Sequence, residues 1–470
     1  MLEIVSVASI GVTVAVGVLA SWYFFVKSRA TDLLRCAKEG FFRALSKFLG
    51  PTAHLWLVDT SKELNNKIFR LPLTPPGFHF VVVTDASVAR TILMDPTTMK
   101  FLPFYRNFEK FTGSPIIGST EGFRYKHARK AIMPAFGSNS IERMSRCISQ
   151  VIDKWVETKL ETAIQNDDSL DIHDEMQRIT AQIISEVGFE YTLSEYQLTT
   201  IIAAFRVLMK EYLNDNMLNP LREYLWFFYP HAKAARNART SYVDLLRSIL
   251  EAHRAKGDKA TPGIIVDIID KNPDYVNDND RVGDLGLFIG AGFETTAGTL
   301  SWTLYLLAKD DVHQSKLREA LRPVSEEEAI HHPMLRNAIR EALRLYPAVA
   351  TGAPRCISKD IHHDGLRIPK GSIVLIPPYP IHRDPDYFDN PNEFLPSRWE
   401  TPTPAMQNAY QPFTMGRRNC MGMSLANIEM QVVLMKLIKN NEFTVREECT
   451  SHFNFTLLPL NLRLGVKKAN

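Results

Sequence analysis

The most informative ten residues of this chain read Phe413-Thr-Met-Gly416-Arg-Arg418-Asn-Cys420-Met-Gly422. A segment with helical periodicity begins directly after them. The first turn of a helix offers unpaired backbone N–H groups and a partial positive charge, and both favour a thiolate over a thiol. Gly416 and Gly422 permit backbone angles and close approaches that a Cβ would prevent. Arg418 adds a cation two residues before the sulfur, so we expect Cys420 to bind a group that carries an anion.

Cys420 alone would support a weaker interpretation. A single cysteine is more often a small buried hydrophobic residue than a ligand, so the flanking pattern carries the argument. A disulfide is the other alternative, but the cysteines are odd in number and widely spaced, and no short-spaced pair suggests zinc or redox chemistry. The five are Cys36, Cys147, Cys356, Cys420 and Cys449. We expect the other four to be free thiols in a reducing compartment.

The pattern F-x-x-G-x-R-x-C-x-G resembles the haem-binding loop of the cytochrome P-450 superfamily of haem-thiolate monooxygenases. The resemblance covers about residues 50–470, with the family's segments in the expected order. It implies the family's mainly α fold with a minor β portion, haem b (iron protoporphyrin IX) as cofactor, and Cys420 as the ligand of the iron. The other positions that this loop contributes to cofactor binding are Phe413, Gly416, Arg418 and Gly422.

Composition is ordinary for a globular protein with a large core, with 45% apolar and 23% charged residues. The net charge of +3 is small and no long basic run occurs, so we expect no nucleic-acid partner. A length of 470 residues allows one large domain or two to three smaller ones. No internal repeat, low-complexity tract or Gly/Ser-rich linker divides residues 50–470, so a single domain is predicted there.

The amino terminus departs from globular composition. Residues 4–26 carry no charge, and at ~1.5 Å per residue they span the ~30 Å apolar core of a bilayer. Trp22 and Tyr23 lie at the end of this run, where such rings favour the membrane interface. A cleaved signal peptide is the alternative. It fits less well, because Glu3 replaces the expected positive start and the apolar run is too long.

Charges around this run predict its orientation. Basic residues follow the run and an acidic residue precedes it, so the positive-inside rule places the rest of the chain in the cytosol. We therefore expect residues 1–27 to be a single-pass transmembrane signal anchor in the endoplasmic reticulum, with the catalytic domain on the cytosolic side. Residues 28–49 are predicted to be a juxtamembrane segment. Their apolar and basic residues fit an amphipathic helix on the membrane, or equally well a surface helix packed on the core.

Helical periodicity dominates the remainder of the chain. Helices are predicted over Ile141–Ile164, Leu198–Tyr212, Ala234–Lys256, Val282–Ala308, Leu335–Leu345 and Ser424–Lys439. Shorter β-like runs are Phe78–Val83, Ile368–Ile376 and Phe453–Val466. Asp85 is expected to cap a helix that runs to about Met94, and the last β-like run is expected to fold as a hairpin around Pro459.

Glu341 and Arg344 stand three residues apart on one predicted helical face, where they can pair. The same spacing occurs at Glu121/Arg124, Glu251/Arg254 and Glu319/Arg322, and most such pairs are solvated pairs worth ~0–1 kcal/mol. The order of the following segments matches the family's E-x-x-R helix only for the first pair. In the family this helix pairs with an arginine of a later F-x-P-x-R segment, here Arg398. The resemblance thus implies a buried structural triad, and it assigns Arg355, which lies between these segments, to cofactor binding.

The segment Gly290-Ala291-Gly292-Phe-Glu294-Thr295-Thr296 lies within a predicted helix, where a glycine costs about 1 kcal/mol relative to alanine. Close packing of another helix is one explanation. The acid–hydroxyl pair also resembles the family's oxygen-activation segment, (A/G)-G-x-(D/E)-T-T. That resemblance implies that Thr295 hydrogen-bonds the oxygen being activated, and that Glu294 feeds protons to it through ordered water. Ala291 and Gly292 would leave room above the haem.

A basic stretch around Tyr125 and Arg129 resembles the family's W-x-x-x-R helix, which contacts a haem propionate. Tyr125 takes the place of tryptophan and can donate one hydrogen bond, and Arg129 matches the family's arginine. A solvated basic face is the alternative. Such a face would also attract an acidic electron donor and speed encounter.

Two aromatic clusters favour a lipophilic substrate, although both are also compatible with core packing. They are Phe101, Phe104, Tyr105, Phe108 and Phe111, and the run 224–230, which falls where the family has a loop that dips toward the membrane. The expected function is insertion of one oxygen atom from O₂ into a lipophilic substrate, with electrons from NADPH delivered by an NADPH-cytochrome reductase. The alternatives are a haem-thiolate isomerase or dehydratase of an oxygenated lipid, a haem-binding protein without turnover, and a membrane protein without cofactor.

Overall fold

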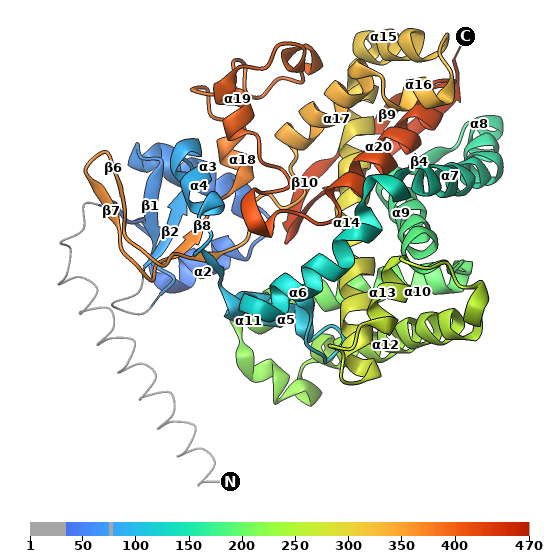
Figure 1. Cartoon of the computed structure of the whole chain (residues 1–470). Helices are drawn as coiled ribbons and strands as arrows, with labels where there is room; N and C mark the ends of the chain where they lie inside the picture. The colour runs from blue at the N-terminus through green and yellow to red at the C-terminus, as the bar shows by residue number, and fades with distance from the viewer. Residues whose placement is uncertain (1–33, 75–78, 470) are drawn as a thin grey trace.

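The computed structural model describes residues 34–74 and 79–469. Helices make up most of it and the strands form small sheets, so the predicted mainly α architecture with a minor β portion is confirmed (Figure 1). The α-helices are α2 (Phe41–Phe48), α3 (Ala53–Leu64), α4 (Ala86–Met94), α5 (Leu102–Glu109), α6 (Gly122–Ile132), α7 (Ser138–Trp155), α8 (Glu161–Asn166), α9 (Ile172–Phe189), α10 (Glu195–Met209), α11 (Asn216–Leu218), α12 (Pro230–Ala255), α13 (Ile265–Lys271), α14 (Asp278–Lys309), α15 (Asp311–Leu321), α16 (Glu326–Ile330), α17 (Pro333–Leu345), α18 (Pro378–Ile381), α19 (Pro404–Ala409) and α20 (Met423–Ile438). The strands are β1 (Ile68–Leu71), β2 (Phe80–Val83), β3 (Met99–Lys100), β4 (Ser169–Asp171), β5 (Arg355–Cys356), β6 (Ile361–His363), β7 (Leu366–Ile368), β8 (Ile373–Leu375), β9 (Asn441–Glu447), β10 (Thr450–Asn454), β11 (Thr456–Leu460) and β12 (Arg463–Lys468).

Short 3-10 and π segments connect or extend these elements. The 3-10 segments are η1 (Ile117–Ser119), η2 (Met133–Phe136), η5 (Pro220–Glu223), η6 (Trp226–Phe228), η7 (Gly257–Lys259), η8 (Pro396–Trp399) and η9 (Gly416–Arg418), and the π segments are η3 (Val156–Leu160) and η4 (Lys210–Asp215). Each of the six helices predicted from periodicity is present, as α7, α10, α12, α14, α17 and α20. The first of them continues through η3 into α8, so one predicted helix contains a π segment.

The largest sheet has the strand order β1-β2-β8-β5-β3, and β2 pairs with β8 in parallel. All four residues of β2, Phe-Val-Val-Val, are buried because the strand is covered on both faces. Val81 and Val83 belong to the core that includes Ile92 of α4. Val82 belongs to the opposite core with Leu57 of α3. The two-residue period of a strand thus assigns alternate side chains to two cores.

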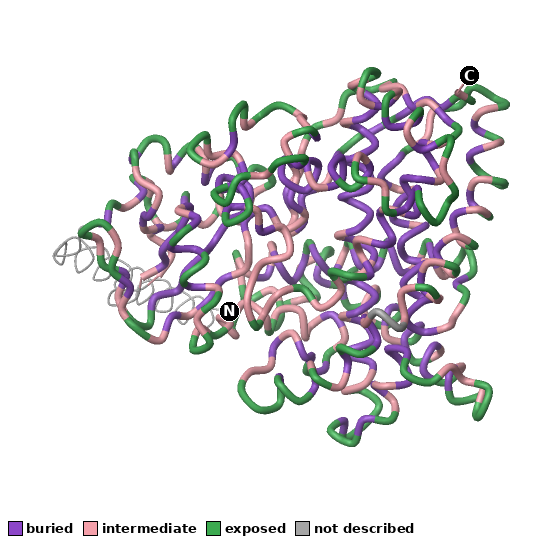
Figure 2. Tube along the Cα trace, turned by 45° about the horizontal axis from the view of Figure 1, so that its top comes forward, coloured by how far each residue is buried: buried purple, intermediate pink, exposed green. Residues whose placement is uncertain are grey.

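Helix α14 runs through the helical part of the molecule (Figure 1). Its 32 residues extend about 48 Å at ~1.5 Å per residue. It contacts α9, α12, α17 and α20, and most of its middle is buried. A helix that is apolar all round belongs in an interior, which explains its weak amphipathicity. Figure 2 shows the same distribution, with buried positions inside the helical part and exposed ones on its outer turns.

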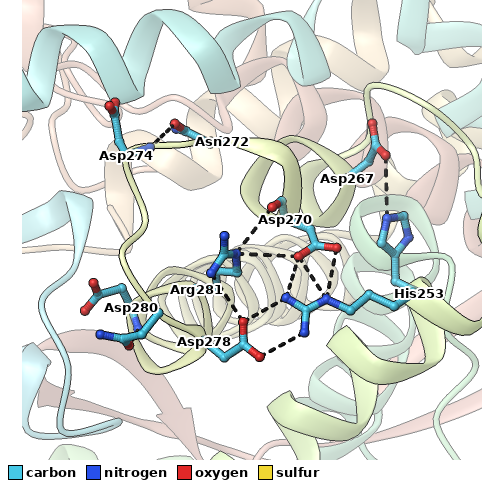
Figure 3. Close-up of polar contacts among 10 residues, drawn as sticks. His253, Asp267, Asp270, Asn272, Asp274, Asp278, Asp280 and Arg281 are labelled. Atoms are coloured by element: carbon cyan, nitrogen blue, oxygen red, sulfur yellow. Dashed lines mark hydrogen bonds and ion pairs between the residues drawn. The ribbon is translucent and has the colours of Figure 1, made fainter.

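Ion pairs connect the end of α12 with α13 and the start of α14 (Figure 3). Arg254 Nη2 lies 2.7 Å from Asp270 Oδ1 and 2.8 Å from Asp278 Oδ1. Arg281 approaches the same two carboxylates, at 3.5 Å from Asp270 and 3.3 Å from Asp278. Arg254 thus pairs with residues of α13 and α14, although Glu251 stands at the spacing that predicts a pair within α12.

The predicted structural triad is present and buried. Arg344 donates to both carboxylate oxygens of Glu341, at 2.8 and 3.0 Å, and neither side chain is exposed. Arg398 Nε and Trp399 Nε1 donate to the same carboxylate, each at 2.9 Å. Arg344 also donates to the His382 carbonyl oxygen at 2.8 Å. The triad therefore fixes the irregular segment that leads to the Cys420 loop.

The predicted hairpin around Pro459 is wrong. The turn lies at Phe455, between β10 and β11, and Pro459 lies within β11 opposite Ser451. Strand β12 instead pairs with β9 and β4. Pro459 is tolerated because β10 and β11 form a two-stranded sheet, where a missing N–H removes no bond to a third strand. Phe455 has a φ of 65°, which is rare for a bulky residue.

The predicted transmembrane anchor at residues 1–27 lies outside the described residues. Across 34–74 and 79–469, no helix combines the length and apolar composition required to cross a bilayer. Of the predicted juxtamembrane segment, α2 packs on the sheet, where the Phe48 ring lies 5.6 Å from Phe80. Leu34 is buried as well, whereas Phe42 is 68% exposed. Within the described part, the surface-helix alternative therefore fits most of this segment.

Candidate haem-thiolate site

A cavity of about 400 Å³ lies between the loop that carries Cys420 and the middle of α14. This volume is within the usual range of small-molecule sites. The loop side is lined by Phe413, Arg418, Cys420 and Gly422, and α14 contributes Ala291, Gly292, Thr295, Thr296 and Thr299. Apolar residues such as Ile117, Leu287, Phe288, Val349 and Phe455 complete much of the wall. The structure thus brings most of the predicted site residues together around one space.

Backbone hydrogen bonds and one glycine shape the Cys420 loop. The Cys420 N–H donates to the Phe413 carbonyl oxygen at 3.0 Å. Gly416 has a φ of 71°, and a Cβ there would overlap the carbonyl oxygen of Leu93 at the end of α4. Gly416 is therefore required by both conformation and space. Gly422 differs from the prediction, because its φ of −82° is open to any residue and its missing Cβ would lie 4.0 Å from Cys420 Sγ.

The Cys420 sulfur faces the cavity at the start of α20. Its surface is exposed to the cavity while protein surrounds it on the other sides. Burial raises the pKa of this thiol, and the Gly422 N–H and the Arg129 charge only partly oppose the rise. In the bare protein, burial therefore outweighs the effect of the helix start on this thiol. A cation bound at the sulfur would reverse the balance, because metal coordination deprotonates a thiol.

Four cationic side chains line one side of the cavity, namely Lys100, Arg129, Arg355 and Arg418. Lys100 of β3 is the direct cross-strand partner of Arg355 of β5. Burial and the charges of Arg355, Arg418 and Arg129 lower the pKa of Lys100 to about 7. Within the described residues, Glu121 is the carboxylate that forms an ion pair with this cluster, through Arg418. Like charges face each other here, so the wall is suited to anionic groups.

Tyr125 and Arg129 of α6 connect this wall to the cysteine loop. Arg129 Nη1 donates to the Asn419 carbonyl oxygen at 2.9 Å and to the Tyr125 hydroxyl at 3.0 Å. The Arg418 guanidinium lies 3.4 Å from the centre of the Tyr125 ring. Arg418 Nη1 is buried without a hydrogen-bond partner among the described residues. Both predicted residues therefore lie at the site, next to an arginine with an unused donor.

Lys100 and Tyr105 were not predicted as site residues. Lys100 belongs to no sequence motif, and Tyr105 was assigned to an aromatic cluster that covers the substrate. In the structure, Arg355 donates to the Tyr105 hydroxyl at 2.5 Å, and both residues line the cavity. The pairing of β3 with β5 brings Lys100 and Tyr105 to Arg355, which lies about 250 residues later in the sequence. No local signal could therefore have identified Lys100 and Tyr105.

The predicted residues of α14 divide between two faces of the helix. Ala291 and Thr295 line the cavity, and Thr295 Oγ1 donates to the Ala291 carbonyl oxygen at 2.8 Å. Glu294 is buried on another face, where its carboxylate accepts from Gln177 Nε2 at 2.6 Å and from the Thr456 hydroxyl at 3.3 Å. Burial raises the pKa of Glu294. The structure therefore places Thr295, but not Glu294, in the cavity wall.

The glycines of this segment serve helix packing. A Cβ at Gly290 would overlap the Phe205 ring of α10, and a Cβ at Gly292 would lie 2.7 Å from Ile184 of α9. Gly292 also lines the cavity. The space that its missing side chain leaves is nevertheless filled by Ile184, and not kept open for a ligand as the sequence suggested. Close helix packing, the alternative explanation for these glycines, is what the structure shows.

These observations fit a haem group. The cavity places a cysteine sulfur opposite a helix that carries a threonine hydroxyl, and a buried, unpaired arginine donor lies in a cluster of cations suited to two carboxylates. Glu429 of α20 is also buried in the wall with an unpartnered oxygen, and burial raises its pKa well above the ordinary value. Burial thus favours the neutral form of this carboxyl over the charged form. The fold and the cavity are compatible with a haem group held by a cysteine sulfur.

Comparison with known proteins identifies the family. The sequence model of the family Cytochrome P450 matches residues 48–465, so the chain belongs to the cytochrome P450 family and is a haem-binding monooxygenase. It is 25% identical to cytochrome P450 4F8 of Homo sapiens over 445 residues, which cover 85% of this chain and 84% of that protein. It is 26% identical to cytokinin hydroxylase of Arabidopsis thaliana over 430 residues, covering 87% of this chain and 81% of that one.

A solved structure shows the same fold. The haem domain of cytochrome P450DA matches with a TM-score of 0.77 and 20% sequence identity, covering 93% of this chain and 98% of that chain. At this identity the match is informative about the fold alone. The resemblance to the cytochrome P-450 superfamily and its mainly helical fold are thereby confirmed.

Proposed function

We propose that the Cys420 sulfur would hold the iron of haem b in the cavity. The observation that carries this proposal is that Cys420 and Thr295 of α14 line the same cavity. Cationic side chains line one side of that cavity. The remaining cofactor contacts that we propose are Phe413, Gly416, Arg418, Gly422, Arg129, Tyr125, Arg355, Ala291 and Gly292. To these we add Lys100 and Tyr105, because the cation cluster would bind the propionates.

When bound, haem supplies the activation of O₂, which is chemistry of the cofactor. The chain contributes the Cys420 sulfur, which would hold this group and donate electron density to it. Thr295 Oγ1 holds a proton at the cavity face of α14 and releases its bond to the Ala291 carbonyl oxygen when it donates elsewhere. Glu294 stores a second proton, since burial keeps its carboxyl neutral more readily than in water. Its partner Thr456 follows Phe455 of the cavity wall in the sequence, and ordered water would carry the proton from there to the cavity.

The proposed reaction inserts one oxygen atom from O₂ into a lipophilic substrate. Support comes from the apolar residues of the wall, including Leu287, Phe288 and Phe455. Electrons would come from NADPH through an NADPH-cytochrome reductase. Arg124, Lys126 and Lys130 of α6 are exposed near the cysteine side, where basic residues attract an acidic partner.

A membrane location is part of the proposal. Residues 1–27 would be the transmembrane anchor in the endoplasmic reticulum, 28–49 the juxtamembrane segment and 50–470 the cytosolic catalytic domain. Between η4 and α12 the chain exposes several large apolar side chains, with Leu221 61%, Tyr224 75%, Phe227 57% and Phe228 71% exposed. Exposed apolar groups of this size mark an interaction surface, and a lipid surface next to an anchored domain would cover them.

The test is reconstitution of the haem-loaded protein with an NADPH-cytochrome reductase in lipid. Lipophilic compounds are first screened for spectral displacement of the water on ferric iron, and the hits are incubated with NADPH under ¹⁸O₂. Incorporation of one labelled oxygen per product is expected. Conversion of a hit without NADPH, or product that lacks the label, would refute the proposal and favour an isomerase or dehydratase.

A further inference from the structure

A second, smaller pocket of about 50 Å³ lies among the end of α5, η4, α11, η5, η6 and the start of α12. Among the described residues, none lines both this pocket and the haem cavity, so the two spaces are distinct. The wall of the small pocket is mostly charged or polar. A buried water occupies about 10–15 Å³ by the same measure, so the pocket can hold a group of about three to five non-hydrogen atoms.

Both carboxylates in the wall are already paired. Glu211 accepts two hydrogen bonds from Arg222, at 3.0 and 2.6 Å. Glu223 accepts one from Lys110 at 2.7 Å. Asp215 lies 3.4 Å from Arg222 outside the wall and has a lysine partner of its own at 2.8 Å. These carboxylates therefore neutralise two of the four cations that line the pocket.

The other two cations are Arg236 and Arg239 of α12, and in the described part of the chain neither forms an ion pair. Their spacing of three residues makes them neighbours on one face of the helix. The Arg236 guanidinium lies 4.5 Å from the centre of the Trp226 ring. Arg239 Nη1 lies beside the turn after α5, because a Cβ at Gly113 would be 3.6 Å from it. The pocket thus has an excess of two positive charges, held in place by packing.

Asn216 adds an unused donor to this wall. It is only 3% exposed, and its Oδ1 accepts from the Lys110 ammonium at 2.9 Å. That bond identifies the other side-chain atom as the amide nitrogen. Nδ2 is buried without an acceptor in the part of the chain that the structure describes. A buried donor without a partner is unfavourable, so an acceptor placed in the pocket would be stabilising.

The start of α12 also favours an anion. Ala232, the third residue of this 26-residue helix, lines the pocket. Tyr229, the residue before the helix, provides no side-chain hydrogen bond to the first turn. A helix start has unpaired N–H groups and a partial positive charge. It acts here together with two unpaired guanidinium groups and the unpartnered amide of Asn216.

We propose that this pocket binds a phosphate monoester group through Arg236, Arg239 and Asn216. Such a group carries about −1.5 to −2 charges at pH 7, which matches the excess of two positive charges. Its three terminal oxygens can accept from donors that come from different elements. A carboxylate carries one charge on two oxygens, so it would leave half of the excess uncompensated.

The site goes beyond the oxygenation chemistry, because it shares no wall with the haem cavity. Two sources offer the same chemistry. One is a free phosphate ester. The other is phosphatidate in a bilayer, which the exposed apolar side chains of residues 221–228 would contact.

Calorimetric titration of the full haem-loaded chain with methyl phosphate and dimethyl phosphate tests the site. The dianionic monoester is expected to bind about tenfold more tightly than the monoanionic diester. Asn216→Asp keeps the oxygen that accepts from Lys110 but replaces the free donor by a charge, and Arg239→Gln removes one cation. Each should weaken the binding of methyl phosphate about tenfold or more. Arg247→Gln is the matched control, because Arg247 lies on the same helix and approaches Asp244 outside the pocket, and it should bind like the unaltered chain.

Thermal unfolding separates the site from the fold. Saturating methyl phosphate should raise the unfolding midpoint of the unaltered chain and of Arg247→Gln, because a ligand that binds the folded state stabilises it. Asn216→Asp and Arg239→Gln should unfold cooperatively and show no such rise. The inference is overturned if methyl phosphate binds no more tightly than dimethyl phosphate. It is also overturned if both pocket variants bind methyl phosphate as tightly as Arg247→Gln does.

Vesicles distinguish the two sources. Binding to vesicles of phosphatidylcholine and phosphatidate is measured for Arg239→Gln and Arg247→Gln, which each lack one positive charge, with vesicles of phosphatidylcholine alone as the blank. Weaker binding of Arg239→Gln assigns the site to the lipid headgroup. Equal binding of the two variants, combined with the loss of methyl phosphate binding in Arg239→Gln, assigns it to a free ester. Either result supports a phosphate site in this pocket.

Discussion

Lys100 and Arg355 are direct cross-strand partners on β3 and β5, and Arg355 is 95% buried. Two cations on adjacent strands repel each other unless an anion lies between them. Burial and, after it, the charge of Arg355 lower the pKa of Lys100 to about 7 in the bare protein, from its ordinary value of 10.5. The relationship is unfavourable for the polypeptide by itself and becomes favourable when carboxylates occupy the wall.

Lys100→Met should have opposite effects on the two forms. In the haem-free chain, Lys100 releases its proton near pH 7 when folded and near pH 10.5 when unfolded. The unfolded state thus binds more protons over that interval, and the stability of the unaltered chain rises with pH across it. Denaturant unfolding at pH 7 and pH 9.5 should show this rise, and the variant should lack it.

In a haem titration, Lys100→Met should bind haem severalfold more weakly than the unaltered chain, since one charged partner of a propionate is lost. Lys359→Met is the control, because Lys359 is 64% exposed and pairs with Asp95. Two results together would contradict the assignment of Lys100 to the cofactor site. One is the same pH dependence of stability in the haem-free unaltered chain and in haem-free Lys100→Met, and the other is equal haem affinity of the two proteins.

Cys420→Ser should abolish the thiolate-type carbon monoxide spectrum of the reduced protein. Serine keeps the size of the side chain but is a poor ligand for haem iron, so the effect reports the bond and not the packing. Cys147→Ser should leave the spectrum unchanged, because Cys147 lies on α7 beside Glu186 and away from the cavity. A retained thiolate spectrum in Cys420→Ser would place the ligand elsewhere.

Thr295→Ala should keep its haem spectrum and convert less NADPH to product, with the difference appearing as hydrogen peroxide. The variant loses the hydroxyl of residue 295, which lines the cavity. Thr303→Ala is the matched control on α14, since its hydroxyl bonds to the Thr299 carbonyl oxygen and does not line the cavity. Equal product per NADPH in the two variants would remove Thr295 from the proposed mechanism.

Glu341→Ala should destabilise the fold by about 3–5 kcal/mol, because Arg344 and Arg398 would be left buried without a counter-charge. Glu142→Ala removes an exposed carboxylate from an i,i+4 pair with Arg146 and should change stability little. Urea unfolding of both variants measures the difference. Similar midpoints would show that the triad contributes less to the stability of the fold than its burial implies.

Asp284→Asn should change how stability depends on pH. Asp284 accepts from the Ile117 N–H at 2.6 Å and from the Tyr275 hydroxyl at 2.5 Å, but burial still raises its pKa from 3.8 to about 6. The folded state thus binds the proton more tightly than the unfolded state, so this group loses stability as the pH rises from about 4 to about 6.

Asparagine can keep both hydrogen bonds without a charge. The stability of Asp284→Asn relative to the unaltered chain should therefore increase between pH 4 and pH 6.5, by about 2–3 kcal/mol. Unfolding free energies at these two pH values provide the measurement, and other carboxyls cancel in the difference. A constant difference would mean that Asp284 is ionised throughout this range.

Local signals predicted the parts of this protein that local physics determines. Asp85 was expected to cap α4, and its side chain accepts from the backbone of Ser87 and Val88 within the same turn. The Cys420 loop was recognised because its glycines and arginine are adjacent in sequence. The long helices followed from periodicity, since each buries a continuous apolar face.

Features that depend on distant partners were beyond such signals. Glu121 stands three residues before Arg124, yet it pairs with Arg418. Glu294 shares a motif with Thr295, but helix geometry directs the two side chains to different faces. Ile184 of α9 fills the space beside Gly292. Predicting this would require knowing which helix crosses α14 there.

The parallel pairing of β2 with β8 has a consequence for synthesis of the protein. Strand β2 leaves the ribosome about 290 residues before β8 does, so one edge of its Phe-Val-Val-Val run waits without a partner. At translation rates of about 5–20 residues per second, this interval lasts about 15–60 s. During that time the unpaired edge of β2 can pair with strands of other nascent chains on the polysome. Pairing with β8 then covers this edge.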